Sequence, residues 1–495
     1  MLNSISFLDT LYQSVTSNSE KTAIRSGGKS VSYKDIVQQA CLIQRSITET
    51  ANKGPLGIVL SDGAEPYAAI LACWFLGYSY VPINAELPEE RLLSIVATSA
   101  ISHIIGDSVP KSLEHLLLRV PKAINNDFQL DLTFYTPTPE TTAYILFTSG
   151  STGVPKGVPI SFANIESFVE SYSSLGFEHS SDERFLQMFD LTFDLSVMSY
   201  LIPLLHGASF STVRSGGMKF MSIASILEDD EITTALMVPS VLVFLRKYFD
   251  EFEFPSLRHS LFCGEALPCS LAQEWQKIVP NAEIVNVYGP TEATIFCSEY
   301  VLPKSSEPKH YNSTVSIGKS LGNSRLIVID EQSKPITSAN VKGELCIGGP
   351  QVTSGYLKRE DLNTSRFISI DSSRYYRSGD ICFVDEAGDI FYVGRLDSQV
   401  QIQGFRVELG EIEYYAEQAA PGATIIAVAK ETDSKGTVVV VFAKSLPNSS
   451  EHLLSQLRKS LPGYMVPNDC VELEAFPLNS NGKIDRLELI KRITV

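Results

Sequence analysis

The feature that most constrains this chain is the regular alternation of short apolar runs with helix-like stretches. Leu56–Leu60, Tyr80–Ile83 and His103–Ile105 are typical of buried strands, and Tyr67–Leu76 and Pro88–Ala97 between them are typical of helices. Such alternation predicts layers of helices on sheets whose strands are largely parallel. The fold class expected is therefore α/β.

The alternation is expected to divide into two domains. It continues through Ile284–Val287, after which Arg325–Asp330 and Glu344–Ile347 predict shorter antiparallel strands. Beyond Gly394–Asp397 the pattern becomes that of a small, compact unit. We predict a large N-terminal multi-sheet α/β domain over residues 1–395 and a small C-terminal α+β lid domain over residues 396–495.

Composition excludes several classes of protein. A formal charge of −17 opposes binding to nucleic acid, whose phosphates carry the same sign. The eight cysteines contain no CxxC pair and lie mostly in apolar runs, which favours reduced core thiols and a cytoplasmic location. A signal peptide needs an unbroken apolar stretch near the N-terminus, and Asp9 interrupts it. The uncharged run from Pro66 to Ala85 is better explained by a buried helix followed by a strand than by a membrane span.

One loop is suited to phosphate. The apolar strand Tyr144–Phe147 leads into a segment of glycines, hydroxyls and one cation: Thr148, Ser149, Gly150, Ser151, Thr152, Gly153 and Lys156. Glycines let backbone N–H groups approach an anion, hydroxyls add donors, and the lysine adds charge. The spacing differs from the P-loop pattern, and by composition alone the segment could also be a surface turn.

Taken with later segments, this loop resembles the signature of the adenylate-forming superfamily, which includes acyl-CoA ligases and nonribosomal peptide adenylation domains. The resemblance recurs in order along nearly the whole chain, in Tyr80–Ile83, Asn286–Thr294, Gly343–Leu345, Tyr376–Asp380, Gly394–Asp397, Gly404–Glu413 and Asn481–Arg486.

The resemblance implies a set of roles. Thr148, Glu292 and Lys483 would be catalytic, with Glu292 holding Mg²⁺ and Lys483 bridging the substrate carboxylate and the α-phosphate. Asp397 would be the hinge between the domains. ATP or AMP would be bound by Thr148, Ser149, Gly150, Ser151, Thr152, Gly153, Lys156, Gly264, Glu265, Asn286, Tyr288, Gly289, Thr291, Asp380, Arg395 and Lys483.

The resemblance also addresses the substrate. Members that activate amino acids carry an aspartate at the position of Asp194, where it pairs with the α-ammonium group; the alternative is that Asp194 only caps a helix. The remaining pocket positions are all apolar: Leu195, Met198, Leu236, Leu261, Cys263, Val287, Ile295 and Phe296. This lining predicts a small aliphatic or imino acid. The runs Phe193–Met198, Leu261–Pro268 and Asn286–Thr294 most resemble D-alanine:carrier-protein ligases, whereas Leu236, Val287 and Phe296 shift the resemblance toward stand-alone enzymes that adenylate L-proline. The resemblance therefore implies D-alanine or L-proline and leaves the choice between them open.

The activity implied is that of a stand-alone ligase. ATP and the amino acid would form aminoacyl-AMP, and the aminoacyl group would then pass to the phosphopantetheine thiol of a separate carrier protein. Gln401 and Gln403 depart from the basic residue that many relatives have in this strand. The alternatives are an acyl-CoA ligase for a non-amino acid, which Asp194 argues against, and a catalytically silent binding module.

Overall fold

The computed structural model describes residues 6–50, 54–59, 63–120, 131–150, 154–213, 219–432, 436–478 and 484–493. Its described helices are α1 (Ser6–Ser17), α2 (Tyr33–Thr50), α3 (Glu65–Phe75), α4 (Glu89–Ser99), α5 (Phe162–Ser173), α6 (Leu195–Leu205), α7 (Lys219–Asp229), α8 (Pro239–Leu245), α9 (Cys269–Ile278), α10 (Glu360–Arg366), α11 (Leu409–Ala419), α12 (Ser450–Ser460) and α13 (Arg486–Lys491).

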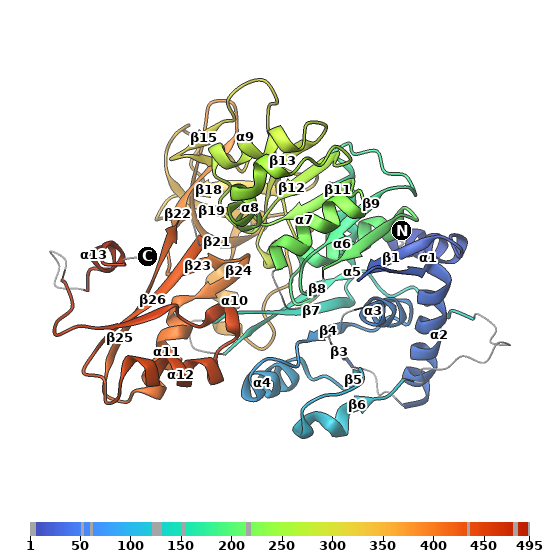
Figure 1. Cartoon of the computed structure of the whole chain (residues 1–495), viewed down its shortest axis with the longest axis horizontal. Helices are drawn as coiled ribbons and strands as arrows, with labels where there is room; N and C mark the ends of the chain where they lie inside the picture. The colour runs from blue at the N-terminus through green and yellow to red at the C-terminus, as the bar shows by residue number, and fades with distance from the viewer. Residues whose placement is uncertain are drawn as a thin grey trace.

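Two large, mostly parallel sheets form the body of the molecule (Figure 1). The six-stranded sheet has the order β6-β5-β3-β4-β7-β8. Its strands are β3 (Leu56–Val59), β4 (Tyr80–Ile83), β5 (His103–Ile105), β6 (Leu117–Leu118), β7 (Thr142–Thr148) and β8 (Lys156–Ser161). Only β8 is antiparallel to its neighbour within this sheet. The predicted α/β class and the strands near residues 56, 80 and 103 are confirmed.

The nine-stranded sheet has the order β17-β14-β13-β12-β11-β9-β10-β1-β2. Its strands are β1 (Thr22–Ser26), β2 (Lys29–Ser32), β9 (Arg184–Gln187), β10 (Ser209–Thr212), β11 (Thr234–Met237), β12 (His259–Phe262), β13 (Glu283–Tyr288), β14 (Ser298–Val301) and β17 (Lys319–Ser320). The central strands from β1 to β13 are parallel, so their carboxyl ends meet along one edge of the sheet.

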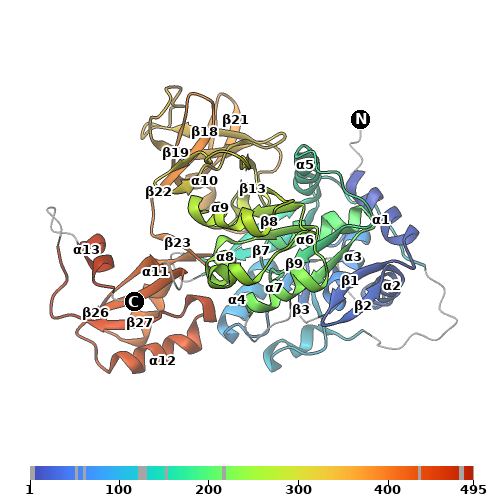
Figure 2. The same cartoon turned by 45° about the horizontal axis from the view of Figure 1, so that its top comes forward.

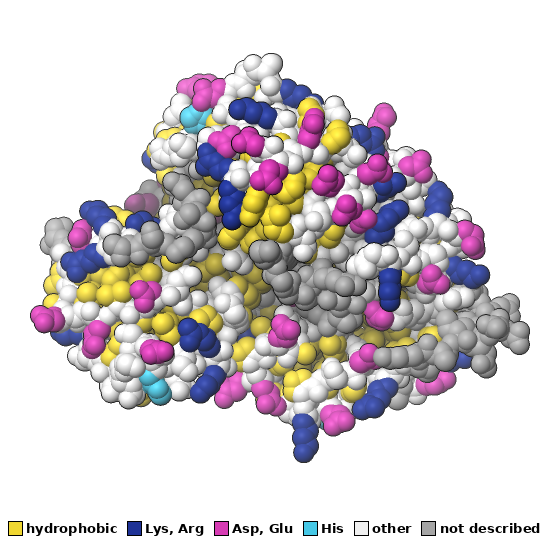
Figure 3. Space-filling model, viewed as in Figure 1, with side chains coloured by type: hydrophobic (Ala, Val, Ile, Leu, Met, Phe, Trp, Pro, Cys, Tyr) yellow, Lys and Arg dark blue, Asp and Glu magenta, His cyan; other side chains and the backbone are white. Residues whose placement is uncertain are grey.

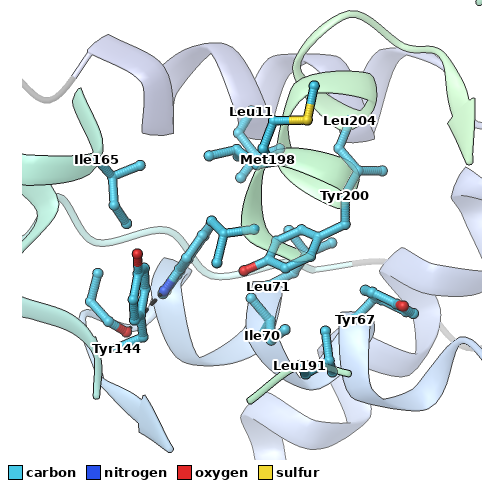
Figure 4. Close-up of a cluster of buried hydrophobic side chains, with 14 of the residues drawn as sticks. Leu11, Tyr67, Ile70, Leu71, Tyr144, Ile165, Leu191, Met198, Tyr200 and Leu204 are labelled. Carbon is cyan, nitrogen blue, oxygen red and sulfur yellow. Dashed lines mark hydrogen bonds between the residues drawn. The ribbon is translucent and has the colours of Figure 1, made fainter. Parts of the chain in front are cut away.

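The main core joins both sheets through α3 and α6. Ten of the eleven residues of α3 are buried, which explains why this stretch is apolar all round without being a membrane span. Trp74 of α3 donates a hydrogen bond to the Ala143 carbonyl at 3.0 Å, and the hydroxyls of Tyr80 and Tyr200 are 2.9 Å apart. Figure 4 shows part of this cluster, with Met198 of α6 among Leu11 and other apolar side chains. Among the described helices, none is long and apolar enough to cross a membrane.

Smaller sheets follow in the second half of the chain. Strands β18 (Arg325–Ile329), β19 (Gly343–Gly348), β20 (Phe367–Ile370), β21 (Ser373–Val384) and β22 (Ile390–Arg395) form an antiparallel sheet. Two short strands, β15 (His310–Tyr311) and β16 (Thr314–Val315), pair separately.

The last described residues form a separate unit with its own cores. Strands β23 (Gln399–Ile402) and β24 (Phe405–Glu408) make a hairpin, and β25 (Thr424–Thr432), β26 (Gly436–Lys444) and β27 (Asp469–Glu472) make a three-stranded sheet covered by α11 and α12. In Figure 2 this unit, orange to red, lies beside the two large sheets. We call residues from Gln399 onward the lid.

Burial accounts for the cysteines. All eight are buried and none is paired, as their apolar surroundings predicted. On the face shown in Figure 3, the described basic and acidic side chains are interspersed, so the net negative charge is not gathered in one patch of this face.

Candidate active site

The phosphate-suited loop begins where β7 ends. Thr148 closes that strand, and Lys156 pairs opposite it at the start of β8. The Thr148 hydroxyl is buried and has no hydrogen-bond partner among the described residues. Ser149 donates to the Arg406 carbonyl at 2.8 Å, and the Gly150 N–H donates to Glu411 at 3.2 Å. Ser151, Thr152 and Gly153, predicted for the same loop, lie outside the described residues.

The carboxyl edge of the nine-stranded sheet supplies the next group. Gly264 and Glu265 follow β12, Asn286 and Tyr288 lie in β13, and Gly289, Thr291 and Glu292 follow β13. Both oxygens of Glu265 are engaged, one by the N–H of Ser240 and the other by the N–H of Gly404, each at 2.8 Å. Asn286 donates to the Ser316 carbonyl at 2.9 Å. Glu265 therefore connects the large sheet to the lid.

Glu292 is a fully buried and strongly ionised carboxylate. It accepts hydrogen bonds from the Tyr356 hydroxyl at 2.5 Å and from Arg406 at 2.9 Å. Burial alone would raise its pKa, but Arg406, Tyr356 and the nearby Lys156 outweigh that effect and lower the pKa to about 2. A hard oxygen donor held in its charged form is chemically suited to Mg²⁺, so this residue fits the predicted metal role.

Asp194 is a buried carboxylate that forms no ion pair with any described residue. It precedes α6, yet its side chain makes no capping hydrogen bond to that helix. It accepts instead from the Ile295 N–H at 3.3 Å. Desolvation raises its pKa to about 7, against the opposing effect of hydrogen bonds from Thr291 and Ile295. The geometry does not support a capping role.

A third group contains the residues predicted to bind ribose and adenine. The Tyr288 hydroxyl donates to Asp380 at 2.5 Å, and Arg395 donates to the other oxygen of Asp380 at 2.6 Å. Arg395 also donates to both oxygens of Asp397, at 2.7 and 2.9 Å. The predicted hinge residue is thus tied to the predicted ribose ligands at the entry to the lid.

Two adjoining cavities connect these groups of residues. The first, about 360 Å³, has Thr148, Ser149, Asp194, Leu195, Cys263 and Thr291 in its wall, and extends between α4 and the lid residues Pro462–Tyr464. The second, about 340 Å³, has Glu265, Asn286, Val287, Tyr288, Asp380 and Arg395 in its wall. Gly264, Gly289, Pro290, Gln401 and Arg406 border both.

The predicted substrate pocket is only partly open. Of its apolar residues, Leu195 and Cys263 line the first cavity and Val287 lines the second. The others line neither cavity and are at most 1% exposed: Met198, Leu236, Leu261, Ile295 and Phe296. The ring of Phe296 packs edge-on against Phe168, with centroids 5.0 Å apart. These residues form a closed wall behind Asp194.

Several charged residues of the site were not singled out from the sequence. Arg406 and Glu408 of β24 reach the groups predicted to bind metal and phosphate, because Glu408 accepts from Lys156 at 3.2 Å while Arg406 holds Glu292. Arg91 of α4 pairs with the fully buried Glu411. The available signal was the number of ionisable residues in the motif Gly404–Glu413. Lys483 lies outside the described residues.

Comparison with known proteins identifies the relatives of this arrangement. Residues 11–357 match the family described as AMP-binding enzyme. A D-alanine–D-alanyl carrier protein ligase of Bacillus licheniformis is 28% identical, with 99% of each chain covered. The delta-poly-L-ornithine synthetase of Acinetobacter baumannii is 32% identical over 96% of this chain, which spans 36% of that protein.

A solved structure agrees in fold. The adenylation domain AlmE of Vibrio cholerae, in complex with glycyl-adenosine-5′-phosphate, superposes with a TM-score of 0.88 at 25% identity, covering 99% of this chain and 98% of that one.

Proposed function

The chain belongs to the AMP-binding enzymes and is an adenylate-forming ligase, and we propose that it activates a small apolar amino acid and transfers it to a carrier-protein thiol. The observation that carries the amino-acid assignment is the Asp194 carboxylate, buried in the wall of the first cavity, which Thr148 and Thr291 also line. A buried carboxylate lacking a cation selects for a ligand that brings one.

The first half-reaction would use both cavities. The nucleoside of ATP occupies the second cavity, where Asp380 accepts from the ribose hydroxyls and Tyr288 lies against the base. The amino acid occupies the first cavity with its ammonium group on Asp194 and its carboxylate toward the shared border. Mg²⁺ would be held by Glu292 and would neutralise phosphate charge when bound. Lys156, Thr148 and Lys483 would orient the reacting phosphate and carboxylate.

The second half-reaction needs a path for the thiol. The first cavity extends from Asp194 to the junction of α4 with the lid, where Leu87 and Arg91 face Tyr464. We assign this extension to the phosphopantetheine arm of a separate carrier protein, with residues 1–395 and 396–495 as the two domains and Asp397 as the hinge between them. The name of the B. licheniformis relative, which spans the same length, supports a carrier protein as acceptor.

The closed wall narrows the substrate. A side chain that lines a water-sized space exposes area to it, yet Met198, Leu261 and Phe296 are completely buried. Space beside Asp194 is therefore limited to what Leu195 and Cys263 leave open, which favours alanine or glycine over proline. The glycyl-adenylate bound by AlmE supports this size limit.

The test is amino-acid-dependent ATP–pyrophosphate exchange over a panel. Glycine and both enantiomers of alanine should support the fastest exchange, and L-proline should support slower exchange. Phenylalanine, lysine and glutamate should support none. If L-proline supported the fastest exchange, the size limit would be refuted but the proposed function would not. Exchange driven by acetate or an aryl acid, with none driven by amino acids, would favour the acyl-CoA ligase alternative.

Transfer is tested separately. After incubation with ATP and the preferred amino acid, a phosphopantetheinylated carrier protein should gain the aminoacyl mass in intact-protein mass spectrometry. The unmodified apo carrier is the control. Equal transfer to free coenzyme A would contradict the proposal that a carrier protein is the acceptor.

A further inference from the structure

Three side chains of different chemistry meet on the large domain outside the two active-site cavities. They are Cys269 at the start of α9, Glu307 in the segment between β14 and β15, and His310 in β15. Each offers one ligand atom, and these three atoms all lie within 4.8 Å of one another. None of the three residues lines either active-site cavity. A thiol, a carboxylate and an imidazole therefore come together where the proposed reaction does not use them.

Backbone contacts bring the thiol and the imidazole together. Strand β16 pairs with β15 on one side, where Val315 lies opposite His310, and meets the residues just before α9 on the other. The Cys269 N–H donates to the Ser313 carbonyl at 2.8 Å, and the Val315 N–H donates to the Leu267 carbonyl at 2.9 Å. In Figure 1 the labels of β15 and α9 accordingly lie close together. Two of the three ligands are thus fixed by main-chain hydrogen bonds.

The third ligand reaches the same place through its neighbour in sequence. The Glu307 carboxylate accepts a hydrogen bond from His310 Nε2, at 3.0 Å. The Lys309 ammonium group, which lies between these two residues in sequence, ion pairs with Asp385 and Asp389, at 2.8 and 2.5 Å. This lysine is therefore occupied by other carboxylates, and Glu307 is left for His310 and an incoming cation.

The donor set favours Zn²⁺. Thiolate and imidazole are ligands that zinc accepts together with a carboxylate, whereas Mg²⁺ and Ca²⁺ prefer oxygen ligands alone. Atoms bound at about 2.0–2.3 Å to tetrahedral Zn²⁺ lie roughly 3.3–3.8 Å apart. Cys269 is 6% exposed and gives a fixed point, while the side chains of Glu307 and His310 are 71% and 35% exposed. These two can rotate toward the thiol, and an ion can reach them from solvent.

We propose that Cys269, Glu307 and His310 form a zinc site whose fourth position is taken by water. On binding, the Cys269 thiol releases its proton to solvent, and the imidazole proton moves from Nε2 to Nδ1, so that the thiolate, Nε2 and one carboxylate oxygen bind the metal. Two negative ligands and one neutral ligand then balance the charge of Zn²⁺. The metal fastens the segment before β15 to α9. This site is separate from Glu292 and does not rest on the proposed function.

Cobalt(II) is the probe, because thiolate-bound cobalt has a near-ultraviolet charge-transfer band that carboxylate-bound cobalt lacks. Titration of the fully reduced, EDTA-treated protein with CoCl₂ should produce this band and saturate at equimolar metal. Added ZnCl₂ should remove the band, because Zn²⁺ is suited to a tetrahedral site that contains a thiolate. Added MgCl₂ should leave it unchanged, since Mg²⁺ prefers oxygen ligands in octahedral geometry.

Variants identify the ligands. Cys269→Ser should lose the band. Glu307→Gln and His310→Ala should each raise the Kd for Zn²⁺ at least about tenfold, because even the outer hydrogen-bond partners of metal ligands contribute 10–100-fold. Cys470→Ser and His452→Ala are the controls, since they remove a buried thiol and an exposed imidazole from the lid. Both controls should keep the parent band and the parent Kd.

Thermal unfolding separates metal binding from damage to the fold. Saturating Zn²⁺ should raise the Tm of the parent protein by a few degrees and should not raise that of Cys269→Ser, whose metal-free Tm reports any damage by itself. Two results would overturn the inference. One is a parent protein that shows no charge-transfer band with cobalt or keeps the band in Cys269→Ser. The other is a parent Kd for Zn²⁺ in His310→Ala.

Discussion

Two buried carboxylates of the site show how neighbouring cations determine protonation. Asp194 is 6% exposed and receives hydrogen bonds only from neutral donors, so desolvation raises its pKa to about 7. Glu292 is even more deeply buried, yet Arg406 and Lys156 help lower its pKa to about 2. A substrate ammonium group would place beside Asp194 a positive charge like the one that Arg406 places beside Glu292.

The first prediction concerns the role of Asp194 in amino-acid activation. Asp194→Asn keeps the shape of the side chain but removes the charge that pairs with the ammonium group. We expect kcat/KM for amino-acid-dependent pyrophosphate exchange to fall at least about 100-fold, as for loss of one partner of a buried charge pair. ATP binding, measured by calorimetry, should stay within a few-fold. Asp190→Asn, at the wall of the same cavity, is the control; near-normal exchange by Asp194→Asn would refute the assignment.

The second prediction concerns stability of the ligand-free protein. The folded-state pKa of Asp194 is about 7, above the ordinary value of 3.8, so between these pH values the folded state binds more protons than the unfolded state at this residue. The contribution of Asp194 to stability therefore falls as pH rises from about 4 to 7. Asp194→Asn should be more stable than the parent at pH 8, and the difference should shrink toward pH 4. Denaturant unfolding at both pH values measures it, and a pH-independent difference would contradict the assigned shift.

At the scale of elements, the turn between β23 and β24 determines how the lid meets the large domain. Gln403 and Gly404 both have positive φ, 53° and 83°, as a two-residue hairpin turn requires. The Gly404 N–H donates to Glu265, and a Cβ added at Gly404 would lie 2.7 Å from the Val238 Cγ1. A side chain at residue 404 would therefore press on Val238 when this turn lies against the large domain.

The third prediction follows from that contact. Gly404→Leu should block seating of the hairpin and lower the rate of thiol transfer more than tenfold, while adenylation stays within a few-fold. Gly422→Leu is the matched control, since Gly422 has φ of 88° but nothing within 4 Å of an added Cβ, so it shares the backbone strain of roughly 1–2 kcal/mol without the clash. Single-turnover measurement of both half-reactions decides; equal effects of the two substitutions on transfer would show that strain alone is responsible.

Sequence reasoning succeeded where local pattern and position are sufficient. The strands around Tyr80 and His103 follow from periodicity and residue type. It could not predict that Phe296 and Met198 are fully buried and form part of a closed wall, because that depends on how α6 packs between the sheets. The pairing of Glu408 with Lys156 could not be predicted from the sequence either, because it depends on the orientation of the lid.

At the scale of the whole molecule, the active site exists only where separate units meet. Its cavities are bounded by the carboxyl edge of the nine-stranded sheet, the loop after β7, the sheet containing β21 and the lid hairpin. The lid contributes Gln401, Arg406 and Tyr464 to the cavity walls in the orientation described. A different lid orientation would leave the large domain's residues in place and exchange these and the other lid residues of the cavity walls for different ones.

The last prediction concerns the lid residue expected to act in the other lid orientation. Lys483 is expected to act only when the lid is oriented for adenylation, where in-line attack of a carboxylate on a phosphate concentrates negative charge. Lys483→Ala should lose several hundred-fold in the first half-reaction, by analogy with the roughly 2.7–4 kcal/mol that one oxyanion donor contributes. Given synthetic aminoacyl-AMP and a phosphopantetheinylated carrier, the same variant should transfer the aminoacyl group at nearly the parent rate, because attack of the thiol on the adenylate involves no attack of a carboxylate on a phosphate. Gly404→Leu should show the reverse pattern. If each substitution impairs both half-reactions to the same extent, the lid does not divide its work between two orientations.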